Sequence, residues 1–112
     1  MIVTKVSETA IKENIHKVDA RKIFDAENMQ LVHIHLNPGE ALKPHITPVD
    51  VVFYILEGQP DVLIGNEKSR VSANMLIESP KNIVHCIYND TDQPARILAV
   101  KAPRPETKSI IV

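Results

Sequence analysis

Short runs of alternating apolar and polar residues, separated by turn residues, make up most of this chain. Residues 29–36, MQLVHIHL, alternate strictly and place Val32, Ile34 and Leu36 on one face. A period of two residues is typical of a β-strand whose two faces meet different surroundings. Residues 51–57, VVFYILE, are apolar on both faces, which indicates a strand that is covered on both sides.

Turn signals divide the rest of the chain into further short strands. We predict them at residues 17–24, 42–46, 61–64, 68–71, 75–78, 83–88 and 95–101, and a short helix over 8–14 that Ser7 caps. About eight to ten short strands without a repeat or a linker indicate a β-sandwich or barrel. We expect one all-β domain over residues 1–112, with an N-terminal arm (1–15), a barrel core (29–100) and a C-terminal tail (102–112).

The composition excludes several classes of partner. Thirteen basic and fourteen acidic residues give a net charge of -1 over 112 residues, and they form no basic stripe. We therefore expect neither a nucleic acid nor a membrane as partner. No apolar run approaches the ~18 residues that span a bilayer. The start of the chain does not read as a signal peptide, and a single cysteine cannot form an internal disulfide, so we expect a cytoplasmic protein.

Two segments place a lone histidine beside turn residues. In residues 38–58, PGEALKPHITPVDVVFYILEG, His45 follows a Pro-Gly turn and the segment ends at a glycine. In residues 80–89, PKNIVHCIYN, His85 lies five residues after a proline and four before an asparagine. These residues are similar to the two motifs of the cupin family of small jelly-roll barrels. The motif places fall on Gly39, His45, Thr47, Val51 and Gly58, and on Asn74, Pro80, Asn82, His85 and Asn89.

The departures from the two motifs fall into two groups. Asn74 and Asn82 stand at glycine places, and asparagine tolerates the left-handed conformation that glycine provides there. We therefore expect a positive φ at both residues and a jelly-roll barrel of the cupin type. The resemblance also implies a metal held by three histidines and a glutamate, but Thr47 and Val51 stand at two of those four places. Asp50 is one residue away and should point to the opposite face.

The two remaining histidines define the predicted site. We expect His45 and His85 to face each other in the barrel lumen, where they either hydrogen-bond a ligand or share a weakly bound divalent transition metal. Further candidates for the ligand site are Lys43 and Thr47, which share the parity of His45, and Phe53.

A second pair of histidines has a spacing that is compatible with metal binding. His33 and His35 lie two residues apart and share one face of their strand. They either replace the missing metal ligands or face outward, and the apolar set of Val32, Ile34 and Leu36, which can fill the barrel, favours the outward direction. The alternation does not decide which face lines the lumen.

These observations support three hypotheses about function. In the first, the protein binds a small polar organic ligand in its lumen, without a stable metal. In the second, the resemblance implies a metal-dependent enzyme, a dioxygenase or isomerase with a rearranged site. In the third, it is a structural or regulatory domain. The residues leave open whether the protein is an enzyme, and fold alone does not decide it. The apolar residues at the chain ends favour a homodimer. The resemblance to the cupin family implies the same, because its members are commonly dimeric.

Overall fold

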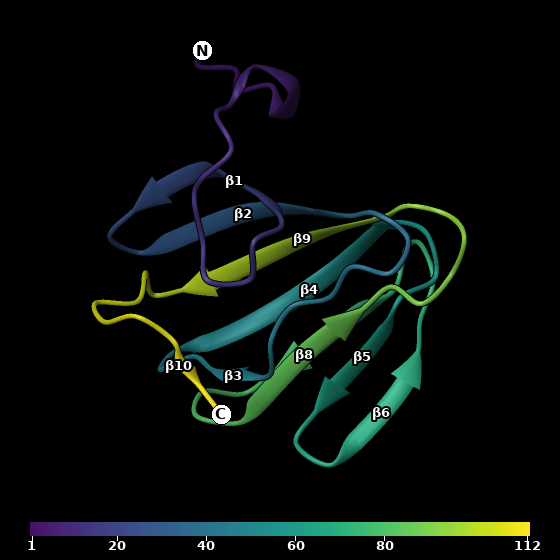
Figure 1. Ribbon diagram of the computed structural model, residues 1–112. Helices are drawn as coiled ribbons and strands as arrows, with labels where there is room; N and C mark the ends of the chain where they lie inside the picture. Colours follow the sequence, from purple (N-terminus) through teal and green to yellow (C-terminus); the bar gives the residue numbers. More distant parts are fainter.

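Ten strands form two antiparallel sheets that face each other across the core (Figure 1). The structure is a computed structural model and describes residues 1–112. The first sheet has the order β1 (Asp19–Ala26), β2 (Met29–Leu36), β9 (Ala95–Ala102), β4 (Asp50–Glu57) and β7 (Leu76–Ser79). The second has the order β10 (Ile110–Ile111), β3 (His45–Ile46), β8 (Val84–Tyr88), β5 (Asp61–Ile64) and β6 (Glu67–Arg70). This confirms the predicted all-β, jelly-roll fold.

The core lies between the sheets and follows the alternation predicted for β2, whereas β4, for which cover on both faces was expected, is fully buried on one face only. On β4 the buried residues are Val51, Phe53 and Ile55, and they alternate with residues that are less buried. On β2, Ile34 and Leu36 point into the same interior. The second sheet contributes Val62, Cys86 and Ile87. Burial of these side chains at roughly 25 cal/mol per Å² is the main force that holds the two sheets together.

Two turn positions that the sequence singled out have the expected backbone conformation. Asn74 has a φ of 71° and Asn82 has a φ of 64°, so both asparagines adopt the left-handed conformation of the glycines they replace. The Asn82 amide donates to the Thr47 carbonyl oxygen at 3.0 Å. This bond ties the turn before β8 to the segment after β3. It helps set the register in which His85 lies opposite His45.

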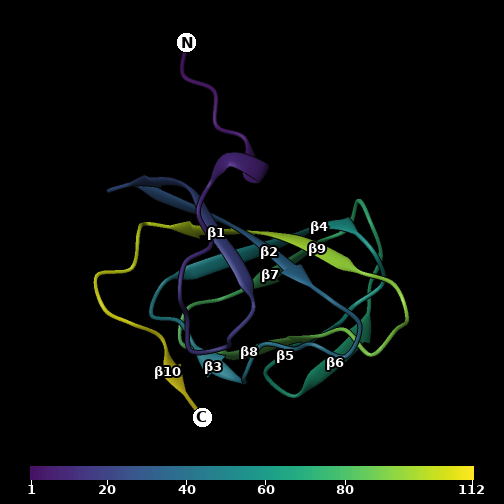
Figure 2. The same cartoon turned by 45° about the horizontal axis from the view of Figure 1, so that its top comes forward.

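The two ends of the chain depart from the prediction. The expected helix over 8–14 is wrong, because the only helical turn is the 3-10 helix η1 (Val6–Glu8). In the structure the arm covers residues 1–18 and has no regular structure apart from η1, and the Lys12 amide donates to the Ala20 carbonyl oxygen. In the tail, β10 pairs with β3, so the second sheet extends beyond the predicted core. Figure 2 shows the arm and the tail passing from one sheet toward the other at the same end of the barrel.

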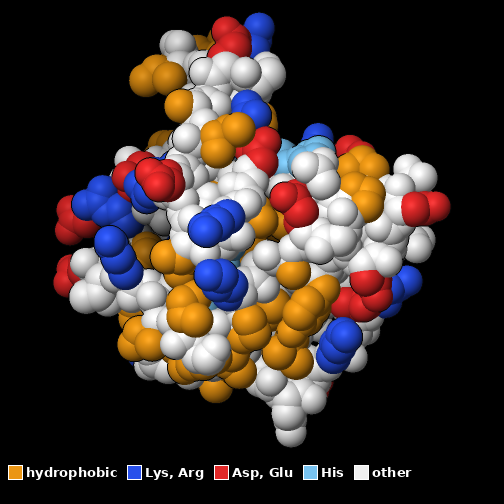
Figure 3. Space-filling view, in the orientation of Figure 1, with side chains coloured by type: hydrophobic (Ala, Val, Ile, Leu, Met, Phe, Trp, Pro, Cys, Tyr) orange, Lys and Arg blue, Asp and Glu red, His pale blue; other side chains and the backbone are white.

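Several large apolar side chains at the chain ends remain exposed. They include Ile2 at 97%, Val3 at 70% and Ile110 at 65% exposure. In the orientation of Figure 1, hydrophobic side chains gather over the lower part of the molecule, where β3 and β8 lie (Figure 3). No helix in the structure is long and apolar enough to cross a membrane.

Candidate functional site

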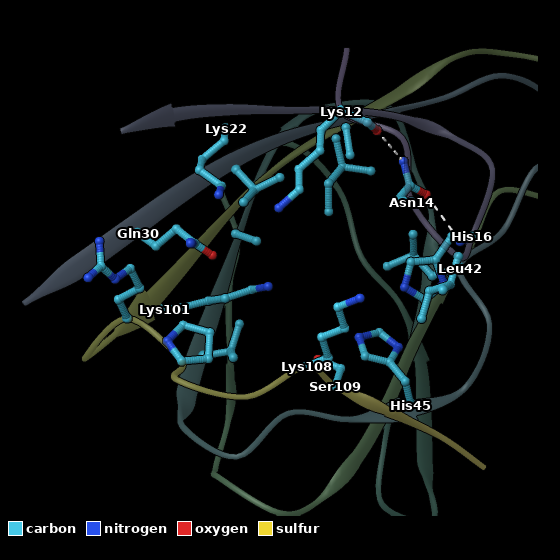
Figure 4. Close-up of a pocket in the computed structure, with 18 of the residues that line it drawn as sticks. Lys12, Asn14, His16, Lys22, Gln30, Leu42, His45, Lys101, Lys108 and Ser109 are labelled. Carbon is cyan, nitrogen blue, oxygen red and sulfur yellow. Dashed lines mark hydrogen bonds between the residues drawn. The ribbon is translucent and has the colours of Figure 1, made fainter. Parts of the chain in front are cut away.

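A cavity of about 560 Å³ lies between the sheets at the end where the arm and the tail cross. The apolar part of its lining includes Val32 and Ile34 from β2, Val51 and Phe53 from β4 and Ala99 from β9. The alternation of β2 therefore directs Val32 and Ile34 to the lumen, and the histidines of that strand to the outer face. Polar side chains from β3, β8, β9, the arm and the tail complete the wall (Figure 4).

His45 and His85 are directly opposite each other on β3 and β8. Both side chains line the cavity, and they are 7% and 2% exposed. Their Nε2 atoms are 3.0 Å apart, and their ring centroids are 4.4 Å apart at an interplanar angle of 72°. The two rings therefore form one hydrogen-bonded pair.

The partners of the pair fix where each proton lies when both rings are neutral. His45 Nδ1 lies 2.7 Å from the Lys43 carbonyl oxygen, which can only accept, so Nδ1 carries the proton of His45. Nε2 of His45 is then an acceptor, and Nε2–H of His85 must donate to it. Nδ1 of His85 is left as an acceptor, and the Ser79 hydroxyl donates to it at 2.7 Å. Every nitrogen of the pair thus has a defined role.

The pair extends to the tail through Thr47. Its hydroxyl oxygen lies 3.1 Å from His85 Nε2 and 3.0 Å from the Ser109 hydroxyl oxygen. Thr47 is 1% exposed and is not part of the cavity surface. Its hydroxyl group therefore contacts the histidine pair from within the protein and not from the cavity. The tail is therefore connected to the histidine pair by two hydroxyl groups.

Burial keeps both histidines neutral near pH 7. Together with the nearby His45 and Lys101, it lowers the pKa of His85 to about 3. Burial also lowers the pKa of His45, although its hydrogen bond to the Lys43 carbonyl opposes the shift. A protonated imidazole here would face a cationic neighbour and little water.

A third histidine, His16 on the arm, completes the histidine cluster. It was not predicted from the sequence as a site residue. Its ring centroid lies 4.6 Å from that of His45. Its Nδ1 accepts a hydrogen bond from the Lys43 amide at 2.8 Å, so the neutral ring carries its proton on Nε2. Burial, His45 and Lys101 lower the pKa of His16 to about 4. Asn14 positions this segment, because its side chain bonds the backbone of Lys12, His16 and Val18.

Four lysines also line the cavity, and none of them was predicted from the sequence as a site residue. Lys101 extends from β9 into the cavity, and Lys12, Lys22 and Lys108 reach the same cavity from the arm, β1 and the tail (Figure 4). Burial lowers the pKa of Lys101, and the charges of Lys12 and Lys22 lower it further. A sequence signal for Lys101 existed, because it lies two residues after Ala99 and so shares its face.

The structure separates the other predicted site residues. Phe53 lines the cavity and its ring centroid lies 5.2 Å from that of His85. The Lys43 side chain is exposed and does not line the cavity; only its backbone contacts His16 and His45. His33 is buried outside the lumen without a hydrogen-bond partner, and His35 bonds the Asn37 side chain. Neither histidine of β2 can therefore join His45 and His85 as a ligand of the same metal ion.

The residues at the site do not fit a resident metal centre of four ligands. No group of three or more His, Cys, Asp or Glu side chains, the cluster of His16, His45 and His85 included, is arranged so that it could hold a metal ion. Val51 has no donor atom, and Thr47 offers a neutral hydroxyl that is already engaged. Asp50 is exposed and accepts a hydrogen bond from the Lys81 amide, as expected for the opposite face. The Lys101 ammonium group in the cavity also disfavours a cation.

The fold and its lumen define a small barrel protein with an internal site. The family model described as "Cupin domain" matches residues 32–101, and the chain belongs to the cupin family. TT1209 from Thermus thermophilus has a similar structure, with a TM-score of 0.80 and 32% identity over 94% of this chain and 100% of that one.

Two further relatives carry names that refer to polyketides. "Tetracenomycin polyketide synthase protein TcmJ" of Streptomyces glaucescens is 34% identical over 80 residues, 68% of this chain and 54% of TcmJ. The chain thus spans about half the length of this curated relative. The polyketide cyclase RemF from Streptomyces resistomycificus has a TM-score of 0.85 at 19% identity, over 100% of this chain and 85% of RemF. At that identity the likeness concerns the fold alone.

Proposed function

We propose that this protein binds a small polar organic molecule in its lumen, beside the His45–His85 pair, without a stably bound metal. The observation that carries the proposal is the neutral, hydrogen-bonded histidine pair on the wall of a cavity of about 560 Å³. A cavity of this size suits one small molecule, and its apolar lining with a few placed polar groups is typical of ligand sites.

The hydrogen bonds of the pair favour binding over acid–base catalysis. In the neutral state both acceptor nitrogens are occupied, one by the partner imidazole and one by Ser79. Neither ring can accept a proton from a ligand without breaking a bond of the network. The chain that they form ends at the Lys43 carbonyl, which has no proton to give. A ligand would therefore contact a fixed polar surface.

The donor set also argues against the alternative of a metal-dependent dioxygenase or isomerase. Two imidazoles without a carboxylate hold a divalent ion weakly, because stable protein sites usually use three or four ligands. Any metal bound here should be lost on chelation and dialysis. The similarity to TcmJ adds one class of candidate ligand, since its name refers to a polyketide, and phenols are a simple probe of that class.

A thermal-shift screen of small carboxylates, sugars and phenols tests the proposal. We expect some compounds to raise the melting temperature of the wild type and to lose that effect in the His45→Ala and His85→Ala variants. Each histidine borders open space, so its truncation enlarges the cavity and should leave the barrel folded. Circular dichroism of both variants checks that the fold is intact.

His35→Ala is the matched control, because it removes a histidine from the outer face and leaves the network untouched. It should respond to ligands as the wild type does. Compounds that stabilise all four proteins equally would show that the lumen histidines are structural only. A stoichiometric metal that survives chelation and dialysis would favour the metal-dependent alternative.

A further inference from the structure

The cavity holds an ammonium group with no carboxylate to balance it. No ion pair joins Lys101 to any acidic side chain. The charged neighbours that affect its pKa, Lys12 and Lys22, are both lysines. A partly buried cation among like charges is unfavourable unless an anion is bound beside it.

The wall around Lys101 carries more positive than negative charge. Five basic and three acidic side chains line the cavity, so its formal charge is +2. Of the three acidic groups, Asp25 is engaged by Lys22 and Arg104, each at 3.4 Å. The other two, Glu13 and Glu106, are exposed and form no ion pair. Lys12 approaches Lys22 closely enough that this contact lowers the pKa of Lys12.

The groups around Lys101 that no protein partner occupies include several donors, whereas the unpaired carboxylates of the lining, Glu13 and Glu106, are exposed. His16 has used its Nδ1 as an acceptor, so its Nε2–H remains free to donate. Lys101 and Lys12 carry only donors, and neither ammonium group forms an ion pair within the protein. By contrast, both acceptor nitrogens of His45 and His85 are occupied. A ligand rich in acceptors and negative charge fits such a wall.

We propose that Lys101, together with Lys12 and the His16 Nε2–H group, forms an anion subsite, so that the lumen ligand carries a carboxylate or phosphate group. The inference rests on the proposed function for the presence of an organic ligand, and it adds the chemical class of that ligand. The three groups of the subsite line the same cavity as the His45–His85 pair.

Isothermal titration with malonate and with inorganic phosphate tests the subsite directly. We expect saturable binding to the wild type and at least a tenfold weaker affinity in Lys101→Met. Lys101→Arg, which keeps the charge, should retain most of the affinity. Malonamide, which has the shape of malonate without its charge, should not bind. Lys43→Met is the matched control, because this lysine is exposed outside the cavity.

The stability of the free protein gives a second readout. Removal of an uncompensated cation should raise the melting temperature of Lys101→Met above that of the wild type, while anion binding weakens. Lys43→Met should change neither quantity. If Lys101→Met does not fold, Lys12→Met is measured instead, with a smaller loss of affinity expected.

The outcomes separate this inference from the proposed function. Binding of malonate and phosphate that survives in His45→Ala but is lost in Lys101→Met supports the anion subsite even if no organic ligand is found. Equal binding to wild type and Lys101→Met, or equal binding of malonamide and malonate, would overturn it. An organic ligand whose binding is lost in His45→Ala but unchanged in Lys101→Met would support the proposed function and contradict the anion subsite.

Discussion

Lys101 on β9 lies directly opposite Val51 on β4, and both side chains line the cavity. Val51 stands at the place where the first cupin motif has a glutamate. The structure therefore puts an ammonium group across from the position of an expected carboxylate ligand. The local charge has the opposite sign to that of a metal-binding lumen, and this relationship can be tested by restoring the missing ligands.

The double variant Thr47→His/Val51→Glu should bind divalent transition metals more tightly than the wild type, because it supplies an imidazole and a carboxylate beside His45 and His85. The new carboxylate would also face Lys101 and pair with it. Adding Lys101→Met should therefore raise the affinity by about a further tenfold, which corresponds to about 1.4 kcal/mol. Titration calorimetry with Zn²⁺ measures both steps. No gain in either variant would mean that these positions do not converge with the histidine pair.

Stability should fall as the pH falls from 7.5 to 4.5. The folded-state pKa of His85 is about 3, below its ordinary value of 6.5, so the unfolded chain takes up a proton in this range and the folded chain does not. His85 alone should lower the free energy of unfolding by about 2–3 kcal/mol at pH 4.5. Urea unfolding at several pH values, compared with a His85→Asn variant, measures this contribution. An identical pH dependence in the variant would contradict it.

Gly58 and Gly39 offer a matched test of close packing. Both have a positive φ, 87° and 86°, so alanine costs about 1–2 kcal/mol at either site from the backbone alone. A Cβ at Gly58 would lie 2.5 Å from the Pro94 carbonyl oxygen, whereas nothing lies within 4 Å at Gly39. Gly58→Ala should therefore cost about 1–3 kcal/mol more than Gly39→Ala in chemical unfolding. Equal losses of stability in the two variants would mean that the turn at Gly58 shifts and relieves the contact with the Pro94 carbonyl oxygen.

We expect the protein to form a homodimer. Ile2, Val3 and Ile110 expose most of their surface, and the outer strands of both sheets have one unpaired edge. Association covers apolar surface and unpaired edges. Sedimentation equilibrium should give twice the mass of the chain, and Ile110→Lys should weaken association. A monomer at high micromolar concentration would contradict this expectation.

The sequence predicted the parts of the site that depend on strand register. His45 and His85 meet because their strands are bounded by turns, and Asn82 adopts the conformation that one of those turns requires. Asp50 points away from the lumen because it is adjacent to Val51 on β4, and successive side chains of a strand lie on opposite faces. Lys101 was missed because residues 95–101 were predicted only as a strand, and no face of that strand was assigned to the lumen.

His16 could not have been predicted from periodicity, because its position depends on contacts of irregular chain. The side chain of Asn14 bonds four backbone groups around it, and Lys17 adopts a φ of 57°. None of these features leaves a repeating pattern of apolar and polar residues. Sequence reasoning therefore located the two strands that hold the histidine pair but not the arm that covers them.

Two segments that line the lumen lie in parts of the chain that the family model does not match. Residues 12–16 and 104–109 line the cavity, whereas the match covers 32–101. In this chain, part of the surface that a ligand would meet is therefore supplied from outside the matched cupin domain. A chimera that keeps these strands and carries the corresponding two segments of TT1209 should therefore differ from the wild type in its affinity for malonate.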